Sequence, residues 1–339
     1  MGQLLDMQNI SKSFGTNRVL QNVHFDLNNG EVHALIGENG AGKSTLMKIL
    51  MGIYTADSGN IKIHGRETAF SGPSQALNAG VAMIHQELNP ILDMSVAENI
   101  FMGKEKRKGV FTDKKGQEKE AAKYLEMLGV HISPSKLMRT LDVSQMQMVE
   151  IAKTLSYGAK IIIMDEPTSA ITDSEVERLF QNIEKLKKQG IGIIYISHKM
   201  DELFKIADRI TVLRDGQYVL TSSINDITPQ QLIRSMVGRE ISEIYPEHKS
   251  TAGKVLLSVR HAGRKGEFND ISFDLHSGEK LGIAGLMGAG RTELVMALFG
   301  ATRLTEGEIV VEGEKVDLKS PAYSIRHRIA LLTEDRKFY

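Results

Sequence analysis

The sequence is marked first by what it lacks. It has no cysteine, which excludes disulfide frameworks, thiol nucleophiles and cysteine metal sites. Its 42 basic and 42 acidic residues cancel, which argues against a general nucleic-acid-binding protein. It has no apolar run of the roughly 18 residues that span a bilayer, and MGQLLDMQNISKSF has neither the basic start nor the apolar stretch of a signal peptide. We therefore expect a protein of cytosolic character that reaches a membrane only through a partner.

The composition that remains is ordinary. Hydrophobic residues make up 41% and charged residues 25% of the chain, as in soluble globular proteins. A length of 339 residues suggests about two domains.

An internal repeat divides the chain. The segment FDLNNGEVHALIGENGAGKST begins at Phe25 and FDLHSGEKLGIAGLMGAGRTE begins at Phe273, an offset of 248 residues (273 − 25). The same offset relates 58–65 to 306–313 (306 − 58). Repeats of this kind indicate duplicated structural units. We predict a complete domain at 1–245, a polar linker at 246–253, and an incomplete second copy at 254–339, as if a longer subunit were truncated.

Four short apolar runs in the first copy each end in polar residues. These runs are VHALIG, VAMIHQ, IIIMDE and IGIIYISH, beginning at residues 32, 81, 161 and 191. Continuous apolar runs are typical of parallel strands that are buried on both faces. A helical pattern at 176–186, opened by the capping-box pair Thr172 and Glu175, lies between two of them. The alternation predicts a doubly wound α/β domain, whose ligands bind beyond the carboxyl ends of the strands.

The first strand end carries a phosphate-binding motif. Residues 37–44 match G-x-x-x-x-G-K-[ST], after a predicted strand and before a predicted helix. Glycines allow backbone N–H groups to surround phosphate oxygens, and the helix N-terminus favours an anion. Lys43 is expected to reach the β- and γ-phosphates and Ser44 to ligate Mg²⁺. The predicted binding residues are Gly37, Glu38, Asn39, Gly40, Ala41, Gly42, Lys43, Ser44 and Thr45.

Acidic and amide residues at the other strand ends complete the predicted site. Asp165 would bind Mg²⁺, and Glu166 would polarise the attacking water. Gln86 is a candidate Mg²⁺ or water ligand, and His198 is a candidate partner of the γ-phosphate. Alone, such a Gln is more often solvated and such a His more often structural. Phe14, in an expected loop, is either a stacking partner for adenine or an ordinary core or surface aromatic.

Taken together, these motifs resemble the ATP-binding cassette family. Within it, QMVEIAKTLS, DEPTSAITDSEVERLF, YISHKMDELFKIADRITVLRDG, MVGRE, GLMGAGRTEL and TEDRK resemble the ATP-binding subunits of bacterial importers for monosaccharides of the ribose, galactose and xylose type. The resemblance implies a cassette fold with a parallel core, an antiparallel β subdomain and a helical subdomain. It also implies an ATPase coupled to sugar transport, with ATP and Mg²⁺ as cofactors.

The resemblance assigns roles residue by residue. It implies that 37–45 is the Walker A loop, Gln86 the Q-loop residue and Asp165 the Walker B aspartate. Glu166 would be the general base, 169–172 the D-loop, His198 the switch histidine and Phe14 the adenine-stacking residue. Two cassettes would pair head to tail at the cytoplasmic face of the membrane. Their partners would be permease subunits and, indirectly, an extracytoplasmic sugar-binding protein, with no nucleic acid involved.

The signature segment departs from the family pattern. Where the family commonly has Leu-Ser-Gly-Gly-Gln, this chain has Leu-Asp-Val-Ser-Gln at 141–145. A carboxylate at Asp142 would repel the γ-phosphate of the opposite site, which predicts a weak signature. The alternative is that Asp142 caps the following helix, and both can hold.

The second copy departs as well. Arg291, Thr292 and Glu293 stand at the counterparts of Lys43, Ser44 and Thr45, and Glu334 stands at that of Gln86. Arginine keeps the charge of lysine but not its shape. The pairing would therefore have one competent and one degenerate site. Because the second signature, Walker B and switch residues are absent, we expect ATP binding with weak turnover. The LGIAG segment would form a strand without its neighbouring Walker B strand.

Three other functions are weighed against the importer. A ribosome- or DNA-associated cassette protein would usually carry basic arms or coiled coils. The charged stretches 104–109 and 113–123 are interpreted as solvated loop and helix faces. A nucleotide-binding fragment without catalysis stays open, and a small-molecule kinase leaves the repeat unexplained.

The segment after Gln86 is a candidate contact with the permease. Its apolar residues form either a groove for the permease or ordinary core; these are Leu92, Met94, Ile100 and Phe101. The sequence does not identify the sugar, and nucleoside import also remains open.

Overall fold

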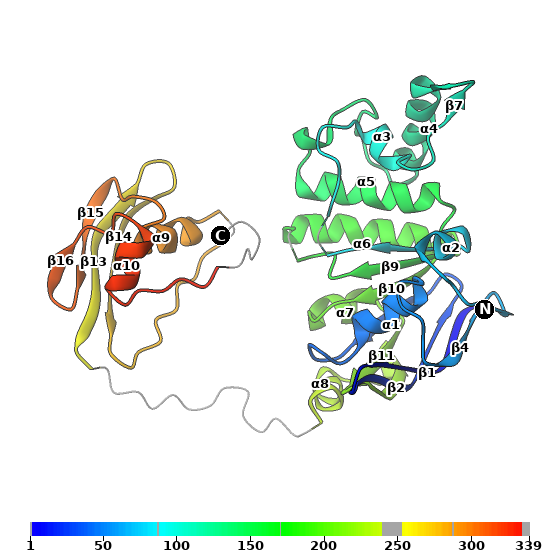
Figure 1. Cartoon of the computed structure of the whole chain (residues 1–339), viewed down its shortest axis with the longest axis horizontal. Coiled ribbons are helices and arrows are strands. Elements are labelled where there is room, and N and C mark those ends of the chain that lie inside the picture. Colours follow the sequence, from blue (N-terminus) through cyan, green and yellow to red (C-terminus); the bar gives the residue numbers. More distant parts are fainter. Residues whose placement is uncertain (1, 87, 170, 239–252, 287, 334–339) are drawn as a thin grey trace. The chain divides into compact units, whose positions relative to one another are not determined.

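The computed structural model describes residues 2–86, 88–169, 171–238, 253–286 and 288–333. The chain divides into two compact units, Met1–Ser242 and Glu243–Tyr339 (Figure 1). The predicted linker at 246–253 lies outside the described residues except for Gly253. The predicted domain boundaries therefore stay a proposal, and each unit is considered by itself.

A ten-stranded mixed sheet forms the framework of the first unit. The strand order is β5-β4-β1-β2-β12-β11-β3-β10-β9-β6. In chain order the strands are β1 (Gln3–Phe14), β2 (Asn17–Asn28), β3 (Val32–Ile36), β4 (Ser58–Ile63), β5 (Arg66–Glu67), β6 (Val81–Ile84), β9 (Ile161–Asp165), β10 (Gly192–Ile196), β11 (Arg209–Arg214) and β12 (Gln217–Ser223). Strands β11, β3, β10, β9 and β6 are parallel, whereas β5, β4, β1 and β2 pair antiparallel. The predicted combination of a parallel core and an antiparallel part is confirmed.

The parallel strands are buried on both faces, as their continuous apolar runs predict. Along β9, Ile162 and Met164 belong to one core cluster, whereas Ile161 and Ile163 belong to the other. This alternation follows from the period of two along a strand. Burial of both faces explains why polar residues gather where the strands end, with His33 on β3 and Thr211 on β11, which lie 2.7 Å apart, as buried exceptions.

The helices of the first unit lie on both faces of the sheet and in a separate helical part. Those in or beside the sheet are α1 (Lys43–Leu50), α2 (Pro73–Asn78), α6 (Asp173–Lys188), α7 (Met200–Ile206), the 3₁₀ helix Ile224–Asp226 and α8 (Pro229–Val237). The helical part holds α3 (Val96–Ile100), α4 (Lys114–Met127), the 3₁₀ helix Met138–Thr140 and α5 (Val143–Ser156), with a hairpin of β7 (Arg107–Lys108) and β8 (Phe111–Thr112). Figure 1 shows this part beyond α6, away from β11. It matches the predicted helical subdomain.

The capping box predicted from Thr172 and Glu175 opens α6. The Glu175 carboxylate accepts a hydrogen bond from the Thr172 backbone N–H at 2.8 Å. The predicted apolar face of this helix is buried against the core at Val176, Leu179 and Ile183. An amphipathic helix with this cap therefore covers β9 and β10, as its sequence pattern predicts.

The second unit repeats part of this order of elements. Its sheet has the strand order β14-β13-β15-β16. Through the sequence repeat, these strands correspond to β2-β1-β4-β5 of the first unit. The elements are β13 (Val255–Arg264), β14 (Phe268–His276), α9 (Arg291–Leu298), β15 (Glu306–Val311), β16 (Glu314–Val316) and α10 (Pro321–Arg326). Helices α9 and α10 begin 248 residues after α1 and α2 (291 − 43, 321 − 73). This is the arrangement that an internal repeat produces, and its identity as a second cassette remains our proposal.

The strand expected at LGIAG in the second unit is not formed. Residues 281–286 have no regular structure, and Leu281 and Ile283 are exposed. The reason is pairing: β3 of the first unit lies between β10 and β11, which have no counterpart among the described residues of the second. The expected neighbour was also wrong, because β10 separates the phosphate-loop strand from β9.

A buried histidine lies on β3 of the first unit. The His33 ring is fully buried 4.5 Å from the Phe25 ring, and its Nε2 lies 2.7 Å from Thr211 Oγ1. Burial lowers the pKa of His33 from 6.5 to about 4, and Arg209 acts in the same direction. The neutral ring is thus the form that fits the core.

We predict that this histidine makes the first unit sensitive to acid. As pH falls from 6.5 toward 4, the unfolded chain binds a proton that the folded chain does not, so stability is lost. The loss amounts to on the order of 3 kcal/mol across this window. Urea unfolding followed by circular dichroism should show a shallower pH slope for His33→Gln, whereas His131→Gln, at an exposed position, should keep the original slope. Equal slopes in His33→Gln and the unsubstituted protein would refute the account.

Candidate nucleotide-binding site

The phosphate-loop motif connects β3 to α1. Gly42 has φ 99° at the N-terminus of α1, in the left-handed region that favours glycine. A Cβ on Gly37 would lie 2.2 Å from the Leu213 carbonyl oxygen, so the loop packs directly on β11. Because α1 begins at Lys43, the unpaired N–H groups of its first turn are available to an anion beside this loop.

The Lys43 side chain folds back over the loop. Its Nζ donates to the Gly37 carbonyl at 2.8 Å and to the Glu38 carbonyl at 3.0 Å. Burial lowers the pKa of Lys43, and the Glu166 and Asp165 carboxylates oppose that effect. The ammonium therefore lies near both acidic residues. A bound phosphate would replace the two carbonyl oxygens as its hydrogen-bond acceptor.

Asp165 ends β9 and has the chemistry of a cation ligand. Burial raises the pKa of Asp165, and the adjacent Glu166 carboxylate raises it further. A bound cation would relieve both effects. The described residues contain no cluster of three or more His, Cys, Asp or Glu that would hold a metal unaided. A cation at Asp165 would need further ligands such as waters or phosphate oxygens. Binding of Mg²⁺ by Asp165 together with Ser44, in the first turn of α1, stays a prediction.

Glu166 brings together the candidates from three strand ends. Its φ is 47°, and its backbone N–H donates to the Ile196 carbonyl at 2.8 Å. Its carboxylate accepts from Gln86 Nε2 at 3.1 Å and lies 3.0 Å from His198 Nδ1. Strands β6, β9 and β10 are adjacent, so their carboxyl ends meet at one edge of the sheet. The three predicted catalytic residues are therefore in contact.

Phe14 lies next to Tyr54, and the predicted D-loop lies only partly within the described residues. Phe14 is the last residue of β1 rather than part of a loop, and it is 43% exposed. Its ring centroid lies 5.1 Å from that of Tyr54 in an edge arrangement. The predicted D-loop at 169–172 includes Ala170, which lies outside the described residues. Stacking of Phe14 on adenine stays a prediction.

Asp142 caps α5, as one of its two expected roles requires. Its Oδ1 accepts from the Gln145 backbone N–H at 2.7 Å. The carboxylate is thus oriented by the helix N-terminus. The other expected role, repulsion of a phosphate on an opposing cassette, remains a prediction.

Comparison with known proteins identifies relatives of the whole chain. The family model described as ABC transporter matches residues 20–169 and 268–339. The ribose import ATP-binding protein RbsA of Lacticaseibacillus paracasei is 49% identical over 98% of this chain and 67% of its own length. The galactose/methyl galactoside import ATP-binding protein MglA 1 of Photobacterium profundum is 51% identical over 98% of this chain and 68% of its own length.

Solved structures share the fold over a length of chain similar to that of the first unit. The ADP conformation of MJ1267, an ATP-binding cassette of an ABC transporter, aligns with TM-score 0.63 at 26% identity, over 70% of this chain and 100% of that one. A nucleotide-free ATP-binding cassette from an ABC transporter aligns with TM-score 0.61 at 26% identity, over 73% of this chain and 100% of that one.

A buried carboxylate that the sequence analysis did not single out supports the site. Glu202 on α7 is 7% exposed, and its Oε2 accepts from Thr168 Oγ1 at 2.8 Å and Tyr195 OH at 2.9 Å. Its Oε1 lies 3.1 Å from Lys199 Nζ. These contacts connect the segment after Glu166 to the segment after His198. Its position four residues after His198 was the available signal, but an exposed helix position would look the same in sequence.

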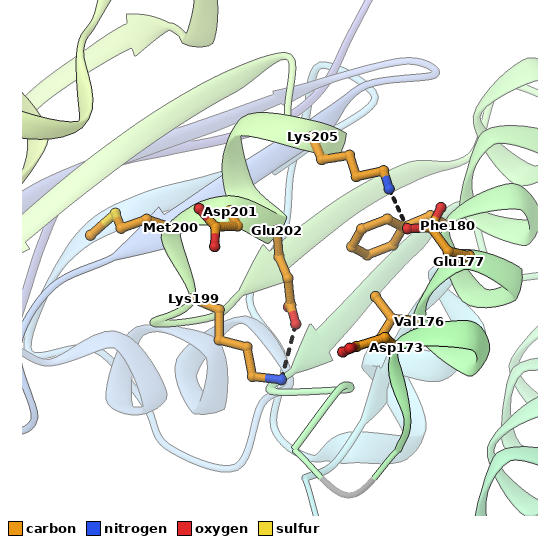
Figure 2. Close-up of a pocket in the computed structure, with 9 residues that line it drawn as sticks. All are labelled: Asp173, Val176, Glu177, Phe180, Lys199, Met200, Asp201, Glu202 and Lys205. Carbon is orange, nitrogen blue, oxygen red and sulfur yellow. Dashed lines mark hydrogen bonds and ion pairs between the residues drawn. The ribbon is translucent and has the colours of Figure 1, made fainter. Parts of the chain in front are cut away.

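Figure 2 shows Glu202 at a pocket of about 430 Å³ between α6 and α7. The pocket also holds an exposed ion pair between Glu177 and Lys205. None of the residues lining it belongs to the phosphate loop. Because Glu202 is buried and Glu177 is exposed at the same pocket, substitutions of the two residues can be compared for their effect on stability.

We predict that Glu202→Leu is strongly destabilising and Glu177→Leu is not. Loss of the Glu202 carboxylate leaves the buried Thr168 and Tyr195 hydroxyls without their acceptor, which costs on the order of 3 kcal/mol. Loss of the exposed Glu177 pair costs less than about 1 kcal/mol. Urea denaturation of the two variants measures the difference. Equal midpoints would mean that the Glu202 contacts contribute little.

Proposed function

The chain belongs to the ABC transporter family, and on that premise we propose that it binds and hydrolyses ATP to drive import of a monosaccharide through a membrane permease. The observation that carries the proposal is the contact of Glu166 with Gln86 and His198, beside the Lys43 loop. The sugar class is supported by relatives named for ribose and galactose import. Because both sugars appear among them, the proposal stops at monosaccharide.

The phosphate loop is proposed to hold the nucleotide. Backbone N–H groups of residues 37–45 would surround the phosphates, and Lys43 would turn from its carbonyl partners to the β- and γ-phosphates. Mg²⁺, when bound, supplies positive charge that neutralises the phosphate oxygens. Ser44, Asp165 and Gln86 are the residues proposed to hold it. Phe14, exposed beside Tyr54, is the proposed adenine-stacking residue.

Glu166 is proposed as the general base. Its carboxylate would accept the proton of the attacking water. Gln86 and His198 would orient this carboxylate through their contacts with its two oxygens. His198 would also turn toward the γ-phosphate. Since the three side chains come from separate strands, a shift of any one strand end changes the position of the base.

The proposed contact with the permease lies after Gln86. Leu92 is 48% and Met94 38% exposed, whereas Ile100 and Phe101 are buried. The four residues expected to share one role are therefore divided: two face solvent and two belong to the core. We propose that the exposed pair receives the permease at the cytoplasmic face of the membrane, with a sugar-binding protein acting beyond it. Among the described helices, none combines the length and the hydrophobicity that a membrane-spanning segment requires.

Head-to-tail pairing of two cassettes is proposed to make one competent and one degenerate site. Arg291 begins α9 at the position where Lys43 begins α1, and Thr292 follows it as Ser44 follows Lys43. Glu334, the counterpart of Gln86, lies outside the described residues. The alternative of a nucleotide-binding fragment without catalysis gains no support from the relatives, which are named as import ATP-binding proteins.

The first test of the proposal is ATP binding and hydrolysis by the purified chain over a range of concentrations. Lys43→Ala should abolish binding, because it removes the cation beside the phosphates. Glu166→Gln should retain binding and lower turnover by about 100-fold or more, as expected for loss of a general base.

Lys62→Ala on β4 is the matched control, and it should leave both measurements unchanged. Turnover should rise with concentration if two chains assemble one site. Undiminished hydrolysis in Glu166→Gln would exclude Glu166 as the base, and binding that survives Lys43→Ala would exclude the phosphate loop.

A second prediction separates the two roles of Asp142. Asparagine caps a helix about as well as aspartate, so Asp142→Asn should keep the stability of the first unit. Removal of the charge should raise ATP turnover if Asp142 repels a phosphate. Asp113→Asn, at the matching cap of α4, is the control and should leave turnover unchanged. Unchanged turnover in Asp142→Asn would leave capping as its role.

A further inference from the structure

The hairpin of β7 and β8 carries the most exposed apolar side chains of the described first unit. Val110 is 88% and Phe111 77% exposed, whereas the next such residue in this unit, Leu92, is 48% exposed. Gly109, with φ 63°, makes the turn that places them. The two strands pair only with each other, so no core holds the tip.

The same segment is strongly basic although the whole chain is neutral. Residues 104–115 contain six basic and two acidic residues, a net charge of +4 (6 − 2), against zero for all 339 residues. Both acidic side chains are engaged locally: Glu105 accepts from the Gly103 N–H at 2.9 Å, and Asp113 from the Gly116 N–H at 3.0 Å. Each therefore already has a backbone partner.

The basic side chains are only partly paired. Lys106 forms an ion pair with Glu120, and Lys114 forms one with Glu98 at 3.2 Å. Within the described residues, Lys108 and Lys115 have no ion-pair partner, and both are exposed. The hairpin thus presents positive charge around an apolar tip.

This pattern matches the surface of an anionic membrane. Exposed apolar side chains that enter the headgroup region, flanked by Lys and Arg that contact acidic lipids, are how proteins bind such a surface. The two apolar side chains form too small a patch for a stable protein interface. A nucleic-acid base could stack on the Phe111 ring but not on Val110, so it would use only part of the apolar tip. Charge and shape therefore favour a lipid partner.

We propose that the hairpin at residues 104–115 binds anionic lipid headgroups, with Val110 and Phe111 entering the interface between them. Figure 1 places β7 at the far end of the helical part, beyond α4. Lipid bound there leaves the phosphate loop uncovered. This lipid-binding activity goes beyond the proposed import function and does not require ATP.

The test is flotation of the full chain with vesicles of phosphatidylcholine, with or without phosphatidylglycerol. We expect binding only to vesicles that contain phosphatidylglycerol, and weaker binding at high salt. Val110→Ser combined with Phe111→Ser should reduce the affinity about tenfold or more. Lys108→Gln and Lys115→Gln should each reduce it about fivefold.

Two control variants lie on α4 outside the hairpin. Met127→Ser removes an apolar side chain that is 45% exposed, and Lys123→Gln removes an exposed charge. Both should bind vesicles like the unsubstituted chain. Lys43→Ala should also keep vesicle binding, so failure of the nucleotide proposal and failure of the lipid proposal are distinguishable.

Three results would overturn the lipid assignment. The first is no binding to phosphatidylglycerol vesicles at low salt. The second is vesicle binding that the Val110 and Phe111 substitutions leave unchanged. The third is binding of a soluble single-stranded RNA that competes with vesicles and depends on the same hairpin residues, which would identify a nucleic-acid site instead.

Discussion

The hydrogen bond from the Glu166 N–H to the Ile196 carbonyl is the contact on which the proposed site depends. A non-glycine residue at φ 47° is locally unfavourable by roughly 1–2 kcal/mol and persists only where its surroundings enforce it. Here the parallel ladder between β9 and β10 leads directly into this bond. After it, the Pro167 carbonyl accepts from Gln147 Nε2 at 2.7 Å, and Thr168 donates to Glu202. The direction of the Glu166 carboxylate thus follows from the packing of the sheet.

The strand ends of the site could be predicted from the sequence, but the strand order could not. The four apolar runs form β3, β6, β9 and β10, because a short continuous apolar run is typical of a parallel strand that is buried on both faces. Nothing in those runs indicates that β10 separates β3 from β9. Neighbour choice depends on the whole sheet. For the same reason Glu202 was not found: its importance lies in its contacts with Thr168, which is distant in the sequence, and with Tyr195, which lies on β10.

The second unit shows how far a local pattern can be trusted. Residues 281–285 and 33–37 both place apolar residues before a glycine-rich turn, yet only the first-unit segment contains a strand. Helices α9 and α10 do form at the repeated positions, because the hydrogen bonds of a helix lie within its own segment. A parallel strand has no such internal bonds and exists only between neighbours. Local structure therefore repeats with the sequence, while sheet structure repeats only where the partners do.

The N-terminus of α5 presents the same constraint in a smaller form. A helix N-terminus attracts an anion through its unpaired N–H groups, whether the anion is a ligand phosphate or a carboxylate of the chain itself. At α5 the Asp142 carboxylate already occupies the Gln145 N–H at 2.7 Å. Any phosphate approaching this end would meet both a used donor and a like charge. The Asp142 carboxylate that caps the free helix is therefore also a like charge for an incoming phosphate, whereas an asparagine at this position would cap the helix without that charge.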